Sequence, residues 1–131
     1  MEASEWRGKV AVVTGASRGI GAEIARFAAG AGLRLGLCAR SEPVLPSSTS
    51  VVSACVDVTD EPGMQGFAER VESELGPIDL WINNAGVLSP IAMVRDVETE
   101  AFRHHIDVNL TGVFIGTKIF IGHRRRHGGG G

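Results

Sequence analysis

The segment that decides the fold is Thr14-Gly-Ala-Ser-Arg-Gly-Ile-Gly21. Its glycines, Gly15, Gly19 and Gly21, have the spacing G-x-x-x-G-x-G and separate an apolar run at residues 9–14 from a segment with helical periodicity. Such glycines permit a tight turn, let the backbone approach a pyrophosphate and let the helix pack closely on the strand. An ordinary glycine-rich turn is the alternative, but the flanking strand and helix favour a turn that binds phosphate at a helix N-terminus.

The rest of the chain continues an alternation of strands and helices. Apolar runs predict further strands at residues 33–39, 51–58 and 78–82. Apolar residues at helical spacing predict helices at residues 19–32, from Thr59 or Asp60 to Leu75, and at 97–121. This order predicts an α/β fold with a Rossmann-type doubly wound parallel sheet.

Two segments follow from this division. Residues 1–122 are predicted to belong to a single Rossmann dinucleotide-binding domain. Residues 123–131 combine three consecutive arginines, two flanking histidines and four terminal glycines. That composition breaks the helical pattern, so we expect an unstructured tail there.

Composition excludes several classes of partner. The chain has 131 residues, is 44% hydrophobic and carries a net charge of -2, so no general attraction to nucleic acid or anionic membrane is expected. It contains no apolar run of 18 residues and no basic start followed by an apolar stretch, the pattern of a signal peptide. Its two cysteines fit a reducing compartment, and we expect a cytoplasmic protein.

Three further motifs follow the glycine turn in order. They are Asp57-Val58 after the third predicted strand, Asn83-Asn-Ala-Gly86 after the fourth, and Asp107-Val-Asn-Leu-Thr-Gly112 in the last helix. With TGASRGIG they resemble the short-chain dehydrogenase/reductase family, and the resemblance runs over about residues 7–121.

The resemblance implies hydride transfer between a nicotinamide cofactor and a small-molecule carbonyl or alcohol. It also implies that the complete enzyme forms a homo-oligomer, a dimer or tetramer. Since complete members of the family have further strands, it implies that the sheet is truncated after about four strands and that residues 1–122 are the N-terminal part of a single Rossmann dinucleotide-binding domain. By their positions in the motifs, the residues expected to bind the cofactor are Gly15, Ser17, Arg18, Gly19, Ile20, Arg40, Asp57, Val58, Asn83, Ala85 and Gly86.

The end of the second strand indicates which nicotinamide cofactor is bound. A carboxylate there binds the ribose 2′-hydroxyl of NAD, whereas an arginine accommodates the 2′-phosphate of NADP. Arg40 follows this strand and Arg18 lies in the glycine turn, while Glu42 comes later, in the loop. We therefore expect NADP, with NAD less favoured; the alternative is that both arginines are solvated surface charges.

The family's proton chemistry uses a Ser, a Tyr-x-x-x-Lys pair and an Asn. Asn109 matches the catalytic Asn by motif, the alternative being a helix residue that bonds backbone locally. The chain contains no tyrosine, and Lys118 lies too early to be the catalytic lysine. We expect a fragment that is inactive alone; the alternative is a non-catalytic variant that binds dinucleotide or associates with other subunits.

No metal site is expected. His123 and His127 are four residues apart and would share one face of a helix, but four glycines follow them. Without a third protein ligand, two histidines make a weak site.

Overall fold

A four-stranded parallel sheet with the order β3-β2-β1-β4 forms the centre of the computed structural model, which describes residues 3–47 and 49–128. Its strands are β1 (Val10–Thr14), β2 (Arg34–Ala39), β3 (Val51–Cys55) and β4 (Leu80–Ile82). The helical segments are η1 (Ala3–Trp6), α1 (Gly19–Gly30), α2 (Glu61–Leu75), η2 (Val94–Asp96), α3 (Thr99–Ile106), the π-helical η3 (Asp107–Thr111) and α4 (Gly112–Arg126).

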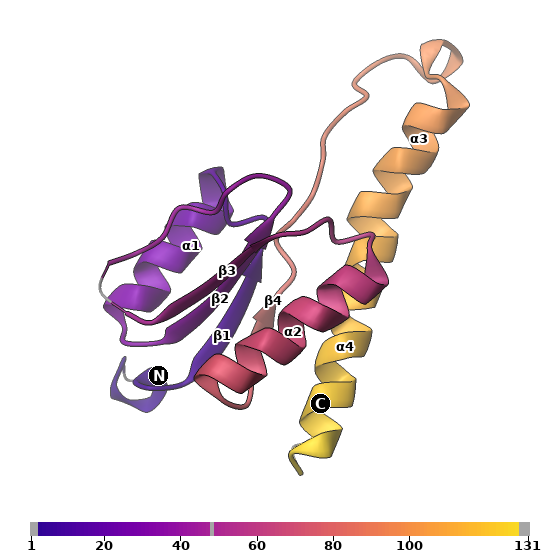
Figure 1. Cartoon of the computed structure of the whole chain (residues 1–131). Helices are drawn as coiled ribbons and strands as arrows, with labels where there is room; N and C mark the ends of the chain where they lie inside the picture. The colour runs from indigo at the N-terminus through magenta and orange to yellow at the C-terminus, as the bar shows by residue number, and fades with distance from the viewer. Residues whose placement is uncertain (1–2, 48, 129–131) are drawn as a thin grey trace.

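Helices cover both faces of this sheet (Figure 1). All five residues of β1 are buried, as the uninterrupted apolar run predicts for a central parallel strand. On one face, Ala25 and Ala29 of α1 share a core with Leu35 and Leu37. The residues of the core on the other face come from α2, α4 and the strands, and include Val12, Met64, Phe67, Val71, Ile115 and Ile119. The predicted fold class is confirmed.

Several helices and strands begin or end at residues other than those predicted, and side-chain hydrogen bonds lie at some of these ends. The third strand ends at Cys55 rather than 58 because Asp57 Oδ1 accepts hydrogen bonds from the Thr59 N–H and hydroxyl, which turns the chain. Asp60 caps α2 by accepting from the Gly63 N–H at 3.1 Å. The helix expected at 97–121 begins at Thr99 and contains a π-helical turn at Asp107–Thr111.

The C-terminal boundary also differs from the expectation. Helix α4 continues to Arg126, so residues 123–126 are helical and not an unstructured tail. The reason is His123, which is 1% exposed and accepts a hydrogen bond from the Ile78 N–H at Nε2, 2.8 Å away. This bond ties the last turns of α4 to the amino end of β4. The last three glycines, 129–131, lie outside the described residues.

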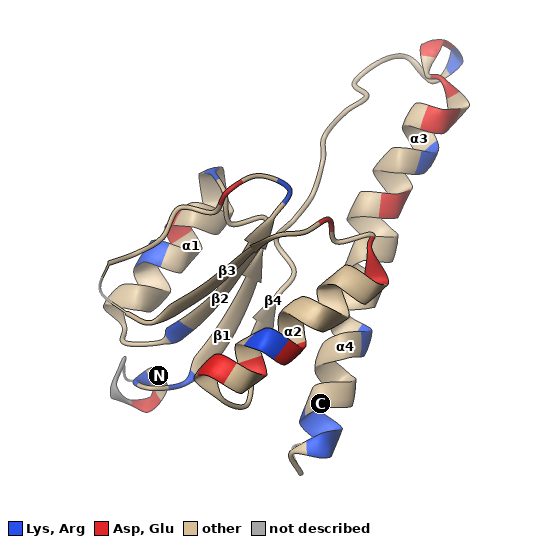
Figure 2. Ribbon diagram, viewed as in Figure 1, with Lys and Arg blue, Asp and Glu red and all other residues tan. Residues whose placement is uncertain are grey.

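Basic residues gather at this end of α4 (Figure 2). Arg124 lies 4.0 Å from Asp79, and Arg126 lies 3.7 Å from Glu72, so acidic side chains partly neutralise them. Within the described ranges, no helix combines the length and apolar character needed to cross a membrane.

The burial of His123 predicts a loss of stability on acidification. Burial lowers the pKa of His123; Glu72 opposes this shift, His127 and Arg126 add to it, and the pKa lies below its ordinary value. Below about pH 6.5 the unfolded chain therefore takes up a proton that the folded chain does not, and the free energy of unfolding falls until the folded pKa is passed. Melting temperatures should fall between about pH 7 and pH 5.5.

His123→Gln provides the matched control for this prediction. A glutamine oxygen can accept from the Ile78 N–H but does not titrate, so the variant should show a flatter dependence of melting temperature on pH over the same range. Equal slopes in the two proteins would contradict the assignment to His123.

Candidate functional site

A cavity of about 570 Å³ opens at the carboxyl ends of the strands. The chain winds from β1 to β2 and β3 on one side, and β4 lies on the other side of β1, so the cavity adjoins the point where strand order reverses. Open α/β sheets bind ligands at such points. The residues that line it are Gly15, Ser17, Arg18, Gly19, Ile20, Gly21, Ala39, Arg40, Ser41, Val56, Asp57, Val58, Asn84, Ala85, Gly86, Val87 and Val108.

The glycine turn forms one wall of this cavity. Gly15 and Gly19 have φ values of 68° and 57°, in the left-handed region that glycine tolerates best. Gly21 lies in the first turn of α1, where an added Cβ would be 2.2 Å from the Gly15 oxygen and 2.4 Å from Asn84 Nδ2. The turn thus packs directly against the segment after β4, and the first N–H groups of α1 lie at the cavity.

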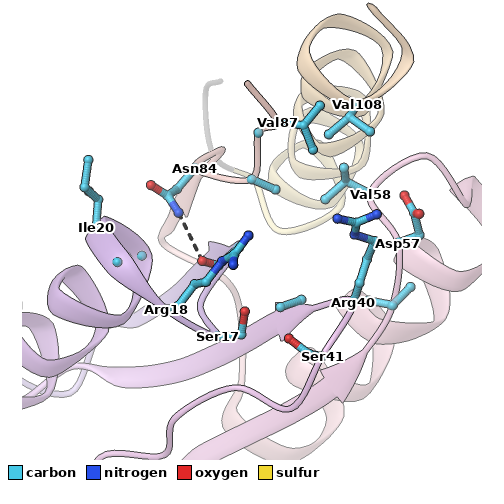
Figure 3. Close-up of a pocket in the computed structure, with 17 residues that line it drawn as sticks. Ser17, Arg18, Ile20, Arg40, Ser41, Asp57, Val58, Asn84, Val87 and Val108 are labelled. Carbon is cyan, nitrogen blue, oxygen red and sulfur yellow. Dashed lines mark hydrogen bonds between the residues drawn. The ribbon is translucent and has the colours of Figure 1, made fainter. Parts of the chain in front are cut away.

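Thr14 and Asn84 hold these two segments together. The Thr14 hydroxyl oxygen accepts from the N–H groups of Asn84 and Ala85, at 3.0 Å each. Asn84 Nδ2 donates to the Thr14 and Gly15 carbonyl oxygens at 3.0 and 3.2 Å, the second bond being drawn in Figure 3. The wall is therefore fixed by hydrogen bonds between residues about 70 positions apart in sequence.

Asn83 has a different place from the one expected. It does not line the cavity; its Oδ1 accepts from Trp81 Nε1 at 3.1 Å and its Nδ2 donates to Thr117 Oγ1 at 3.2 Å, which joins β4 to α4. Of the Asn-Asn pair, the structure places Asn84, and not the expected Asn83, in the cavity lining. Because successive residues of an extended segment point to opposite sides, only one of the two can face the cavity, and it is Asn84.

Two cations face the open space of the cavity. Figure 3 shows the Arg18 side chain reaching from the glycine turn and the Arg40 side chain reaching from the end of β2, with its guanidinium near Asp57. Asp57 is the one acidic residue in the cavity lining given above. Burial acts to raise the pKa of the Asp57 carboxyl, but hydrogen bonds from Thr59 and the charges of Arg40 and His104 outweigh it and hold that pKa below its ordinary value.

Ten of the residues expected at the site line this one cavity: Gly15, Ser17, Arg18, Gly19, Ile20, Arg40, Asp57, Val58, Ala85 and Gly86. The expectation omitted Asn84, which the N-N-A-G motif contains, and Gly21, which the glycine motif contains. It also omitted Val108, which lies inside the last motif, on η3. The remaining omitted lining residues lie outside the four motifs: Ala39, Ser41, Val56 and Val87.

Asn109, the expected catalytic residue, lies just outside this lining. It sits in the π-helical turn, where its Oδ1 accepts from the Val87 N–H at 2.8 Å and its Nδ2 donates to the Val87 carbonyl oxygen at 2.7 Å. The Asn109 side chain thus bonds both the N–H and the carbonyl oxygen of Val87. In this structure Asn109 fixes the cavity wall at Val87.

Glu72 lies beside the two C-terminal histidines, His123 and His127, at the opposite end of the sheet from the cavity. Glu72 of α2 contacts His127 Nε2 through one oxygen, and its other oxygen lies 3.2 Å from His123 Nδ1, without the alignment of a hydrogen bond. His123 Nε2 accepts from a backbone N–H, so in the neutral ring Nδ1 carries the proton. Histidines that bind metal instead donate through their second nitrogen, so this cluster fits an ion-pair network better than a metal site.

Comparison with known proteins agrees with this geometry. A family model described as short chain dehydrogenase matches residues 9–130. The chain is 33% identical over 130 residues to L-fucose dehydrogenase of Mus musculus, a match that covers 96% of this chain and 48% of that protein.

Solved structures show the same likeness. A short-chain type dehydrogenase/reductase from Mycobacterium marinum superposes with a TM-score of 0.86 at 32% identity, covering 94% of this chain and 51% of the other. Carveol dehydrogenase from Mycobacterium avium, solved in complex with NAD, superposes with a TM-score of 0.84 at 28% identity, covering 95% and 52%. The chain spans about half the length of each of these three proteins.

Proposed function

The chain belongs to the short-chain dehydrogenase family, and we propose that it is the NADP(H)-binding half of an oxidoreductase that interconverts small-molecule carbonyls and alcohols. The observation that carries the proposal is the pair of guanidinium groups, Arg18 and Arg40, at one cavity beside a phosphate-binding turn. When bound, the nicotinamide cofactor supplies or accepts the hydride.

The polar groups of the cavity suit the parts of a dinucleotide. The first N–H groups of α1 and its N-terminal dipole favour a pyrophosphate next to Gly19 and Ile20. Asp57 keeps its negative charge and accepts hydrogen bonds, as recognition of an adenine amino group requires. The walls at Val58 and Val108 are apolar and suit the faces of rings.

The preference for NADP rests on charge at the end of β2. A ribose 2′-phosphate carries close to two negative charges and offers several acceptor oxygens, which planar guanidinium groups bind in a bidentate way. Ala39, Arg40 and Ser41 occupy the place where an NAD-specific site needs a carboxylate. Titration calorimetry with NADPH and NADH tests the proposal: NADPH should bind at least about tenfold more tightly, as one charge-assisted contact predicts, whereas equal dissociation constants would overturn it.

A further expectation concerns catalysis. The chain contains no tyrosine, the residue that serves this family as general acid and base, and a missing general acid costs about 10²- to 10⁴-fold in rate. Incubated alone with NADPH and a panel of sugars, aldehydes and cyclic ketones, the chain should bind cofactor but oxidise it no faster than a buffer control. Sustained, substrate-dependent oxidation by this chain alone would contradict the assignment.

A further inference from the structure

His105 is the outer member of a hydrogen-bond network that ends at the cavity. Its Nε2 lies 2.9 Å from Asn109 Nδ2, and its Nδ1 lies 3.0 Å from the Ser89 carbonyl oxygen. Asn109 in turn bonds both backbone groups of Val87, which lines the cavity. One histidine on α3 is therefore linked to two points of the segment that follows β4.

The partners determine the proton positions throughout this network. The Val87 N–H can only donate, so it fixes Asn109 Oδ1 as its acceptor and Nδ2 as the amide's donor. The two hydrogens of Nδ2 then point at the Val87 oxygen and at His105 Nε2, which must be unprotonated. The Ser89 oxygen can only accept, so His105 Nδ1 carries the proton.

Every hydrogen-bonding group of the two side chains is thus used once, in one arrangement. Neutral His105 with its proton on Nδ1 satisfies both neighbours, whereas the other tautomer would leave two donors facing each other at Asn109 and two acceptors facing each other at Ser89. Leucine at this position could serve neither contact. Asn109 would then have one free hydrogen, and the segment 87–89 would lose its second anchor.

We propose that His105 is a positioning residue for the dinucleotide site, acting through Asn109 to hold the wall at Val87. The inference rests on the proposed function, because its effect is read as cofactor affinity. Through the bonds described, His105 contacts no residue of the cavity lining. It fixes the orientation of the Asn109 side chain and the position of the Ser89 carbonyl group, and Asn109 in turn fixes Val87 in the cavity wall.

The first test compares three variants with the unaltered chain by NADPH titration. His105→Leu should weaken binding by roughly 3- to 10-fold, the factor expected for one or two net hydrogen bonds. His105→Gln keeps an oxygen that can accept from Asn109 and should recover most of that loss. Arg103→Leu is the matched control on the same helix, since the Arg103 side chain bonds only Glu100 among the hydrogen bonds described, and it should bind as the unaltered chain does.

The outcomes separate the inference from the function on which it rests. If the unaltered chain binds neither NADPH nor NADH, the proposed function fails. If it binds NADPH and His105→Leu binds equally well, or if His105→Gln loses as much as His105→Leu, the role of His105 is refuted.

A second measurement needs no variant and holds even if His105→Leu fails to fold. Nitrogen-15 NMR of the unaltered chain reports which imidazole nitrogen carries the proton. The network predicts the Nδ1–H tautomer for His105 at neutral pH, with an unprotonated Nε2. Observation of the Nε2–H tautomer would overturn the inference.

Discussion

Replacing Gly21 with alanine should abolish measurable NADPH binding and destabilise the fold. A Cβ at this position would lie 2.2 Å from the Gly15 oxygen and 2.4 Å from Asn84 Nδ2, so the turn and the segment after β4 would have to separate. Overpacking of this kind costs about 1–3 kcal/mol of unfolding free energy. The same displacement breaks the two hydrogen bonds from Asn84 that shape the cavity wall, which is why binding should fail even where the fold survives.

Gly66→Ala is the control for this prediction. Gly66 also lies within a helix, but an added Cβ there would meet nothing within 4 Å, so alanine should raise stability by up to about 1 kcal/mol through helix propensity and leave binding unchanged. Urea unfolding followed by NADPH titration measures both effects. If Gly21→Ala unfolds at the same urea concentration as the unaltered chain and still binds NADPH, the close approach has no functional role.

Replacing Arg40 with alanine should remove most of the preference for NADPH over NADH. A charge-assisted contact is worth about 1.5–3 kcal/mol, so the NADPH dissociation constant should rise roughly 10- to 100-fold. The NADH dissociation constant should change by less than about threefold, because NADH has no 2′-phosphate for the guanidinium to bind. Loss of affinity confined to the phosphorylated cofactor is the signature of a direct contact.

Two comparisons make this result specific. Arg95→Ala removes an exposed arginine of η2 that does not line the cavity, and it should leave both dissociation constants unchanged. Arg18→Ala should weaken NADPH in the same direction as Arg40→Ala, since both side chains face the open space. If Arg40→Ala weakens the binding of NADPH and of NADH equally, Arg40 supports the shape of the pocket and does not bind the 2′-phosphate directly.

Local patterns predicted the sheet correctly, and most of the residues that they assigned to the cofactor line one cavity. The apolar runs and the glycine motif are short-range signals, and they place Gly15, Arg18 and Arg40 at the carboxyl edge without any knowledge of long-range contacts. The choice between Asn83 and Asn84 required the orientation of a segment after β4. That orientation is set by Thr14, about 70 residues away, and no local pattern encodes it.

At residues 123–126 the sequence predicted an unstructured tail, whereas the structure has the end of helix α4. The glycines that follow residue 127 favour a frayed end when only helix propensity is considered, although arginine itself is a good helix former, and residues 123–127 lack the apolar spacing of the preceding helix. In the structure, the buried contact between His123 and the Ile78 N–H extends the helix, with Glu72 nearby. Tertiary contacts of this kind override weak local preferences, and they depend on the packing of α2 and α4 against the sheet.

The central claim is that a nicotinamide dinucleotide occupies this cavity with its 2′-phosphate near Arg18 and Arg40. Parallel NMR titrations of nitrogen-15-labelled chain with NADPH and NADH test it most directly, because they report location and affinity together. The account predicts saturable shifts at Gly15, Gly19, Asp57 and Ala85 with both ligands, tighter binding of NADPH, and shifts at Arg18 and Arg40 that are larger with NADPH. Shifts confined to residues outside the cavity, or identical titrations with the two cofactors, would contradict it.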